Sequence, residues 1–392
     1  MAIQANALTR IKKTRDYFLE FAQSQQFAGI LLIICTVFSI GISNSLFSSG
    51  WLHFIHSNFL NIKLEWIVND VFMSFFFLLV GLEIRRQLLI GELSSKKTAA
   101  LPIAGALGGM LFPALIFILF NLGSHTLQGW AIPTATDIAF AVGILNLLGN
   151  RVPTTLKVFI TALAVVDDLG AVLIIAIFYS NNIDILYLIM LFAAIPICNY
   201  LLKKTTNGFY FVYAAVGILF FTLLHHAHLH TTLAGVILAA ITPYNKNDDD
   251  SKLNTVEHHL NKPVNYFIIP LFALFNTAIV LECDIINHFD LNLFAGIFLA
   301  LVVGKPIGIT LFSWMACKLK LAELPKQIEI EKIFWVSILG GIGFTMSIFI
   351  SILAFKETYL IEQSKLIVLI ASSFAAVLGF VMLKIKFRKR VE

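Results

Sequence analysis

The chain has 392 residues, of which 58% are hydrophobic and only 13% are charged. Its mean hydropathy is +0.86. Soluble domains carry about 25% charged residues, so this composition excludes both a soluble enzyme with a small anchor and a disordered chain. The long continuous apolar runs exclude an outer-membrane barrel, whose strands alternate over short segments. The four cysteines form no CxxC motif, which argues against a metal knuckle and a disulfide framework.

Twelve apolar runs follow one another along the chain, and one membrane-spanning helix needs about 20 such residues. The runs lie at 27–45, 66–84, 99–121, 126–149, 155–179, 184–202, 208–225, 229–243, 263–281, 291–317, 333–355 and 362–383. This pattern predicts an all-α polytopic membrane protein that forms a single domain over residues 1–392.

The basic residues predict the orientation of these spans. With the N-terminus in the cytoplasm, the lysines and arginines that lie outside are Lys63, Lys356 and Lys365, out of 28. Lys305 remains inside a span, and all the others lie in inner loops or tails. The positive-inside rule predicts this asymmetry for an even number of spans with both termini in the cytoplasm.

The same threading predicts four segments outside the membrane. They are basic cytoplasmic tails at 1–26 and 384–392, an outer loop at 46–65 and a cytoplasmic loop at 244–262. The basic C-terminal tail favours contact with lipid headgroups over contact with nucleic acid.

Two adjacent aspartates, Asp167 and Asp168, stand in the middle of the fifth run. A charge at mid-bilayer costs at least ~2.5–3.5 kcal/mol on insertion scales, so such residues indicate a functional site. Neighbouring residues on a helix point about 100° apart, so one carboxylate can line a cavity while the other reaches a neighbouring helix. Two close carboxylates also resist joint ionisation, which favours a site where protons bind and leave.

The fourth and eleventh runs each contain a helix-breaking feature. Pro133, which has no amide hydrogen, precedes Asp137, and a run of glycines ends at Gly343. One interrupted span in each half of a chain is the sequence pointer to a transporter with inverted repeats. Residues 99–179 and 291–383 are the expected repeats, although no direct sequence identity between them is visible.

Crossed broken helices would bring like ends together, positive at the N-termini and negative at the C-termini. Asp137 would then offset two positive ends, with the Thr136 hydroxyl bonding a freed backbone group. Lys305 would offset two negative ends, or pair with Asp167 or Asp168. Snorkelling to an interface is the alternative, which its position midway along the span disfavours.

Other polar residues leave plainer explanations open. Asp70, near the outer end of the second span, and Glu83, at its inner end, are equally explained by interfacial polarity. The histidine cluster that ends at His230 has no cysteine or acid beside it, so partial solvation explains it better than a metal site. Glu257 and His258 precede the ninth span, where they either titrate near physiological pH or form an ordinary polar loop.

Six motifs, spread over nearly the whole chain, carry a specific resemblance. They are WIVND from Trp66, FLLVGLE from Phe77, WAIPTATDIAFA from Trp130, AVVDDLGA from Ala164, VGKPIG from Val303 and GIGFTMSIFI from Gly341. In these stretches the chain resembles the NhaA family of bacterial sodium–proton antiporters.

The resemblance implies twelve transmembrane helices in two inverted-topology repeats, with helices four and eleven broken and crossing. It implies a secondary active transporter, not an enzyme, that exports Na⁺ and Li⁺ in exchange for H⁺ entry. Transport would be electrogenic and pH-regulated, by alternating access, with Na⁺ and H⁺ competing for buried aspartates. No cofactor is expected. The expected partners are the two ions, the lipid bilayer and a second copy in a homodimer, in the bacterial inner membrane with both termini cytoplasmic.

The resemblance also assigns roles to individual residues. By the family pattern, Asp168 is central to ion and proton binding, and Asp167 shares the site and pairs with Lys305. These two aspartates would be the side-chain ligands of the transported Na⁺. Asp137 and Lys305 also belong to the ion- and proton-binding positions, and the supporting positions are Thr136, Asp70 and Gly343. The pH-response positions are Glu83, Glu257, His258 and His230.

Two positions depart from the family pattern. Gln87 stands where the family has a second acid, and Asn261 stands where it often has a histidine. Both fall in the pH-sensing region, so they bear on the pH at which transport switches on and not on the transport chemistry. The segment 47–64 takes the place of the hairpin through which the family dimerises.

Other function classes fit the residues less well. A proton-coupled carrier of a small organic solute needs a larger pocket with converging polar and aromatic groups, whereas these candidates are small and acidic. An intramembrane prenyltransferase or protease needs spaced aspartates that the motifs do not supply. A channel leaves the buried Lys305 unexplained, and no phosphate-binding glycine loop points to an ATP-driven pump.

Overall fold

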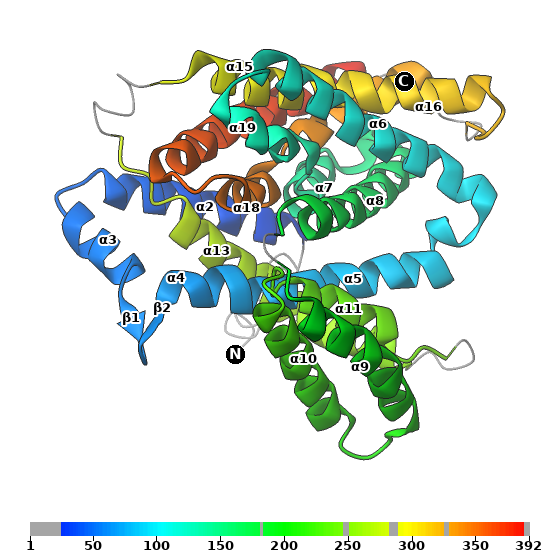
Figure 1. The fold of residues 1–392 in the computed structure, drawn as a ribbon. Coiled ribbons are helices and arrows are strands. Elements are labelled where there is room, and N and C mark those ends of the chain that lie inside the picture. Colours follow the sequence, from blue (N-terminus) through cyan, green and yellow to red (C-terminus); the bar gives the residue numbers. More distant parts are fainter. Residues whose placement is uncertain (1–24, 181–182, 246–250, 282–288, 325–328, 388–392) are drawn as a thin grey trace, which may run out of the picture.

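The computed structural model describes residues 25–180, 183–245, 251–281, 289–324 and 329–387 (Figure 1). The expected tail at 1–26 therefore lies almost wholly outside the described residues, as does the end of the tail at 384–392.

Helices make up nearly all of the described chain. The first half contains α2 (Gln25–Ser43), α3 (Ser48–Ile55), α4 (Leu64–Trp66), α5 (Met73–Leu89), α6 (Lys96–Asn121), α7 (Ile138–Leu147) and α8 (Thr154–Phe178). The second half contains α9 (Ile185–Lys204), α10 (Phe209–His226), α11 (Leu233–Ile241), α12 (Lys252–Pro263), α13 (Ile269–Asn276), α15 (Leu291–Leu299), α16 (Lys305–Lys318), α17 (Ile330–Ser337), α18 (Phe344–Ala354) and α19 (Thr358–Lys386).

Shorter elements join or interrupt these helices. Three are π-helical, namely η1 (Ile67–Phe72), η5 (Val264–Ile268) and η6 (Ala300–Gly304). Four are 3₁₀ segments, namely η2 (Glu92–Ser94), η3 (His125–Thr134), η4 (Gly149–Arg151) and η7 (Ile338–Gly341). Two short strands, β1 (Asn58–Phe59) and β2 (Ile62–Lys63), pair antiparallel.

Within the described ranges, seven helices are long and apolar enough to cross a membrane, and up to ten qualify when each sharply bent helix pair is counted as one span. Lipid offers no hydrogen bonds to the backbone, so spanning segments must satisfy their own polar groups, as helices do. The expectation of an all-helical, polytopic membrane protein is confirmed.

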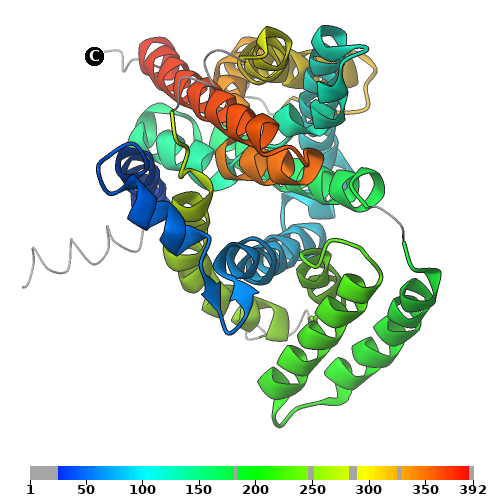
Figure 2. The ribbon, with the colours of Figure 1, turned by 60° about the vertical axis from the view of Figure 1, so that its left-hand side comes forward.

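Two of the bent pairs lie where the sequence predicts interruptions. Between η3 and α7, which meet at 42°, residues 135–137 leave the helical conformation. Between η7 and α18, where the bend is 53°, residues 342–343 do the same. In both views the broken helices lie in the middle of the molecule (Figures 1 and 2). Helices α6, α16 and α19 cover one side of them, and α2, α5 and α13 cover the other.

Glycines let α6 and α16 pack closely. A Cβ atom added at Gly108 would collide with the carbonyl oxygen of Gly308, and one added at Gly308 would collide with that of Gly108. In lipid, where apolar burial gives little drive for association, such close backbone contact is a principal source of helix–helix attraction. The two helices are thereby fixed against each other along their middle turns.

Two segments outside the apolar runs contain regular structure. The expected cytoplasmic loop at 244–262 contains α12, which begins after a Ser251 cap and continues through η5 into α13. Its polar composition hid it from a search for apolar runs. The expected outer loop at 46–65 contains α3 and the β1–β2 hairpin, whose turn residues Leu60 and Asn61 have φ of 51° and 66°. Positive φ at both positions is typical of a type I′ hairpin turn.

The glycine contact between α6 and α16 predicts a stability difference. Gly108→Ala should lower the free energy of unfolding by about 1–3 kcal/mol, because the added methyl group meets backbone that cannot move aside cheaply. Gly41→Ala in α2 is the matched control, since nothing lies within 4 Å of its Cβ position. Thermal unfolding midpoints of the two detergent-solubilised variants measure the difference. Equal midpoints would contradict a tight α6–α16 contact.

Candidate functional site

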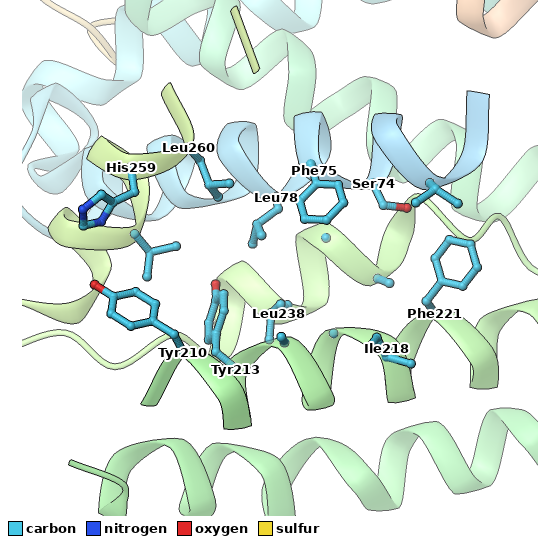
Figure 3. A pocket seen from close by; sticks show the side chains of 16 residues that line it. Ser74, Phe75, Leu78, Tyr210, Tyr213, Ile218, Phe221, Leu238, His259 and Leu260 are labelled. Carbon is cyan, nitrogen blue, oxygen red and sulfur yellow. The ribbon is translucent and has the colours of Figure 1, made fainter. Parts of the chain in front are cut away.

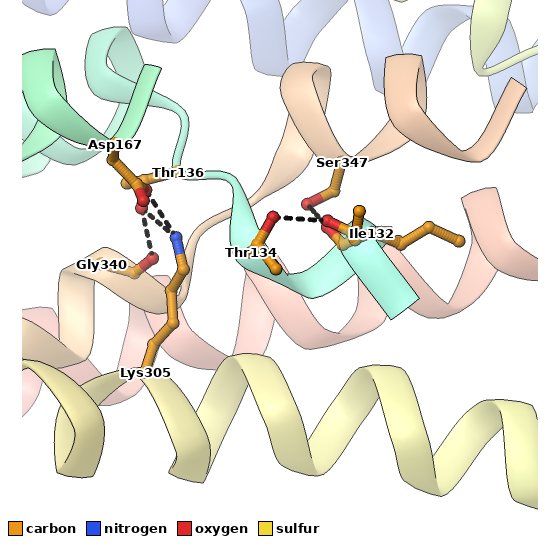
Figure 4. A network of polar contacts seen from close by, with 8 residues as sticks. Ile132, Thr134, Thr136, Asp167, Lys305, Gly340 and Ser347 are labelled. Atoms are coloured by element: carbon orange, nitrogen blue, oxygen red, sulfur yellow. Dashed lines mark hydrogen bonds and ion pairs between the residues drawn. The ribbon is translucent and has the colours of Figure 1, made fainter. Parts of the chain in front are cut away.

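The two helix breaks cross and bond to each other. The backbone N–H of Asp137 donates to the carbonyl oxygen of Ile342 at 2.7 Å. The hydroxyl of Thr136 donates to the carbonyl oxygen of Gly340 at 3.0 Å, as Figure 4 shows. The non-helical residues of each span therefore satisfy backbone groups of the other, which explains how two interrupted helices can exist among buried residues.

Asp137 lies at the N-termini of both half-helices that leave the crossing. One carboxylate oxygen accepts the Phe140 N–H of α7 at 3.0 Å. The other accepts both the N–H and the hydroxyl of Thr345 in α18, at 3.2 and 2.5 Å. Because helix N-termini carry partial positive charge, one buried carboxylate here offsets two of them. Asp137 is only 3% exposed, so this compensation takes place away from water.

Lys305 reaches the opposite side of the crossing from α16. Its side chain is fully buried, and its Nζ lies 2.8 Å from Oδ2 of Asp167. Nζ also donates to the hydroxyl of Thr136, which in turn donates to Gly340 (Figure 4). The ammonium group thus lies close to the C-terminal ends of η3 and η7, where partial negative charge accumulates.

Asp167 and Asp168 are both buried, at 1% and 2% exposed. In each, the Oδ1 atom accepts no hydrogen bond from the described residues. The charge on Asp168 is repelled by Asp167 and Asp137 and attracted by Lys305. Buried carboxylate oxygens with unused acceptor capacity are ligands that hard cations prefer.

Two hydroxyl groups complete the crossing. The Ser347 hydroxyl donates to the carbonyl oxygen of Ile132 at 2.7 Å, and the Thr134 hydroxyl donates to that of Ala131 at 2.7 Å (Figure 4). Both carbonyls lie near the C-terminal end of η3, where the break removes their helical donors. Ser347 and Thr345 were not predicted as site residues, although both occur in the motif that follows the glycine run.

Comparison with known proteins agrees with this geometry. The sequence profile of a family described as Na⁺/H⁺ antiporter 1 matches residues 19–383. Proteins named Na(+)/H(+) antiporter NhaA are 45% identical over 95% of this chain in Flavobacterium psychrophilum and 44% over 96% in Cytophaga hutchinsonii. The protein of that name in Citrobacter koseri is 42% identical over 93% of this chain, and each match covers 97% of the relative. The chain belongs to the Na⁺/H⁺ antiporter 1 family. The resemblance inferred from the motifs is thus confirmed.

The residues to which the family resemblance assigns a pH response fall into two separate groups. At the C-terminal end of α5, Arg86 forms an ion pair with Glu257 of α12 at 2.9 Å. Glu83 lies near enough to both to interact electrostatically. Burial raises the pKa of the Glu257 carboxyl above its ordinary value, and the Arg86 guanidinium opposes that rise. His258 and Asn261 line a cavity of about 270 Å³ together with this ion pair.

The second group lies at the N-terminal end of the same long helix, in and around η1. Asp70 accepts the Thr231 hydroxyl at 2.7 Å, and His230 bonds the Tyr179 carbonyl at 2.8 Å through Nε2. Asp70 and His230 line one cavity of about 230 Å³. These contacts place both residues outside the crossing that holds Asp137, Asp167 and Asp168 in this antiporter-family chain.

A larger apolar cavity of about 410 Å³ lies between α5, α10, α11 and α12 (Figure 3). Its walls are side chains such as Leu78, Phe221 and Leu238, with the hydroxyl of Tyr210 and the ring of His259 at one end. It shares no lining residue with the crossing, and none of its lining residues is an acid. In this family member, the apolar cavity and the carboxylates are therefore separate features.

The double capping by Asp137 generates a prediction. Asp137→Ala should reduce the free energy of unfolding by about 1–4 kcal/mol, twice the usual cost of losing one cap, because it leaves amides of two helices unpaired. Asp184→Ala is the control, since Asp184 caps only α9, through the Leu186 N–H at 2.9 Å. Unfolding midpoints at one pH compare the two variants. A smaller loss for Asp137→Ala than for Asp184→Ala would contradict the shared cap.

Proposed function

We propose that this chain is a secondary Na⁺/H⁺ antiporter that exports Na⁺, and also Li⁺, in exchange for H⁺ entry. The observation that carries the proposal is the buried Asp167–Asp168 pair beside two crossed helix breaks, with one oxygen on each carboxylate free of hydrogen bonds from the described residues. The names of the relatives agree with this activity. As a transporter of this family, the chain needs no cofactor, because the ions are its substrates.

Competition for one site couples the two ions. Ionised Asp168, with Asp167 and backbone or hydroxyl oxygens, offers the oxygen ligands that a hard cation prefers. Protonation removes the negative charge that attracts Na⁺, so the site holds either Na⁺ or protons. A site that opens to one side at a time then exchanges the ions across the membrane.

Lys305 makes the exchange sensitive to charge. When a cation binds Asp167, the ammonium group loses its partner and releases a proton or moves away. Because two acids and one amine can titrate, we infer that more than one H⁺ enters for each Na⁺ that leaves, so transport is electrogenic. Equal Na⁺ flux at every membrane potential would contradict this inference.

The proposed topology has twelve spans with both termini in the cytoplasm of a bacterial inner membrane. Helix α11 and the helix formed by η5 and α13, which continues α12, supply the two spans beyond the ten counted by length and composition. The proposed inverted repeats are 99–179 and 291–383. Their support is that each has one broken helix between two continuous ones.

The proposed dimer uses the β1–β2 hairpin. Leu60 at its tip is 81% exposed, and Phe59 and Ile62 are also exposed. An exposed strand edge with apolar side chains is suited to pairing with a second copy. The particle mass in detergent, with and without residues 58–63, tests this assignment.

Asp168→Asn is the decisive variant for the proposed activity. In inside-out vesicles from cells that lack other sodium antiporters, an acid interior is built and Na⁺, Li⁺ or K⁺ is added while a dye reports the pH gradient. Wild-type protein should collapse the gradient with Na⁺ and Li⁺ but not with K⁺. Asp168→Asn should abolish the collapse, because the amide cannot ionise.

Asp184→Asn is the matched control for that experiment. Asp184 caps the exposed start of α9 and takes no part in the crossing, so this variant should retain activity. No cation-dependent collapse by wild-type protein at any pH, with the protein present in the membrane, would overturn the proposal and favour a proton-coupled carrier of an organic solute.

The Arg86–Glu257 ion pair predicts a change in pH dependence. In Arg86→Ala, the pKa of Glu257 should rise further, because the guanidinium that opposes the effect of burial is gone. If ionised Glu257 is needed for activation, half-maximal activity should move to higher pH. Arg151→Ala, on the inner surface but outside this pair, is the control. An unchanged profile in Arg86→Ala would argue against a pH-sensing role for the pair.

A further inference from the structure

Lys305 directly follows a π-helical segment. In η6 the backbone hydrogen bonds skip one residue more than in an α-helix, and the Lys305 N–H donates to the carbonyl oxygen of Ala300, five residues earlier. π segments are rare and costly, and they persist where something in the sequence or the packing holds them. The residue after Lys305 is Pro306, within the first turn of α16.

Pro306 explains the π turn. Proline has no N–H, and in a continuous α-helix its ring would collide with the carbonyl four residues earlier, here that of Val302. Widening the preceding turn by one residue relieves that collision. It also leaves the Leu301 carbonyl without a helical donor. In an α-helix, the Leu301 carbonyl would accept a hydrogen bond from the Lys305 N–H, but here that N–H donates to Ala300. The next residue, Pro306, has no N–H to donate.

Contacts on both sides hold the helix around this turn. Gly304 lies against the backbone of Pro113 in α6, and Gly308 lies against Gly108. The Leu301 carbonyl oxygen lies so close to Gly341 of η7 that a Cβ atom there would collide with it. Since these contacts restrict sliding, the direction of the Lys305 side chain depends on the number of residues in the turn.

We propose that Pro306 is a positioning residue for ion exchange: by holding the π turn of η6, it directs Lys305 to Asp167 and Thr136 at the crossing. This inference rests on the proposed antiport. Replacing the π turn by an α-helical one would shift the register by one residue, which turns Lys305 by about 100° around the helix axis. The charged groups that face Lys305 are Asp167 and Asp168 of α8, whereas the residues around it in this turn, Leu301, Gly304 and Gly308, meet glycine and proline backbone of α6 and η7.

The chain contains a matched control for this idea. In η5, the Ile269 N–H donates to the Val264 carbonyl, again five residues earlier, and Pro270 follows. This second π turn and its proline are placed like the first, but Ile269 has no charged group to direct. Pro270→Ala therefore measures the general effect, on stability and on transport, of losing a buried proline that follows a π turn.

The experiment restores the missing amide. Pro306→Ala and Pro270→Ala are compared in full-length protein, with Pro306→Gly as a second variant that restores the same N–H without adding a side chain. Vesicle assays record Na⁺-dependent exchange against Na⁺ concentration and pH. Na⁺-dependent thermal stabilisation of purified protein records binding without transport.

We expect Pro306→Ala to raise the Na⁺ concentration for half-maximal exchange about tenfold at a fixed pH near neutrality, and to move the pH profile towards higher pH. Without the ammonium group nearby, the carboxylates hold their protons more firmly against Na⁺, and the difference should shrink at alkaline pH. Pro270→Ala should change unfolding temperature or maximal rate but leave both profiles in place.

A double-mutant cycle with Lys305→Ala tests whether the effect of Pro306 on Na⁺ binding passes through Lys305. If Pro306 acts through Lys305, adding Pro306→Ala to Lys305→Ala should not weaken Na⁺-dependent stabilisation any further. Additive losses, or wild-type profiles in folded Pro306→Ala and Pro306→Gly, would overturn the inference. So would an equal shift in Pro270→Ala. Absence of Na⁺-dependent exchange in the wild-type protein would instead overturn the proposed function.

Discussion

A helix broken inside a membrane leaves backbone groups unpaired at both new ends, and lipid supplies nothing to pair them. This protein contains two such breaks, and the rest of the structure depends on how they satisfy each other. Asp137 serves the two N-terminal ends, while Thr136 links the Gly340 carbonyl to Lys305. Long helices on either side shield this small polar region. The charges that stabilise the breaks are therefore placed beside the two aspartates proposed to exchange ions.

That arrangement makes Lys305 both structural and responsive. A buried lysine is costly to keep charged, and removing one partner of a buried ion pair is costly as well. In the proposed exchange, its bond to Asp167 holds only while that carboxylate is ionised and not occupied by a cation. Ion binding and the compensation of the helix ends are thus linked through one side chain. The Asp70 group and the Glu257 group lie apart from it, so neither belongs to the proposed exchange site.

Much of this could be predicted from the sequence, because charges and prolines in apolar runs have few explanations. Asp137 after Pro133, the glycines that end at Gly343 and Lys305 in mid-span all indicated crossed breaks. The Thr345 and Ser347 partners were not predicted, since a small hydroxyl in an apolar run gives no sign of which neighbour it faces.

The remaining elements are harder to recognise from the amino-acid sequence. α12 was not predicted, because a helix of such polar composition resembles a loop in hydropathy. The π turns were not predicted, because one additional residue in a turn leaves the pattern of apolar residues almost unchanged. The hydrophobic core cannot be assigned to helix faces from the sequence in spans that are apolar all round, so their neighbours become known only from the structure.

The contact of Gly108 with Gly308 also limits how the molecule can move. Two backbones that already touch cannot approach further, and sliding by a fraction of a turn would push a carbonyl into the opposing chain. We therefore expect helices α6 and α16 to move together as one rigid body. Because each helix belongs to a different proposed repeat, a movement that opens one face of the crossing also moves the other face through this α6–α16 pair. In the proposed alternating-access mechanism, opposite openings are then mutually exclusive, and an exchanger needs that exclusion in order not to leak.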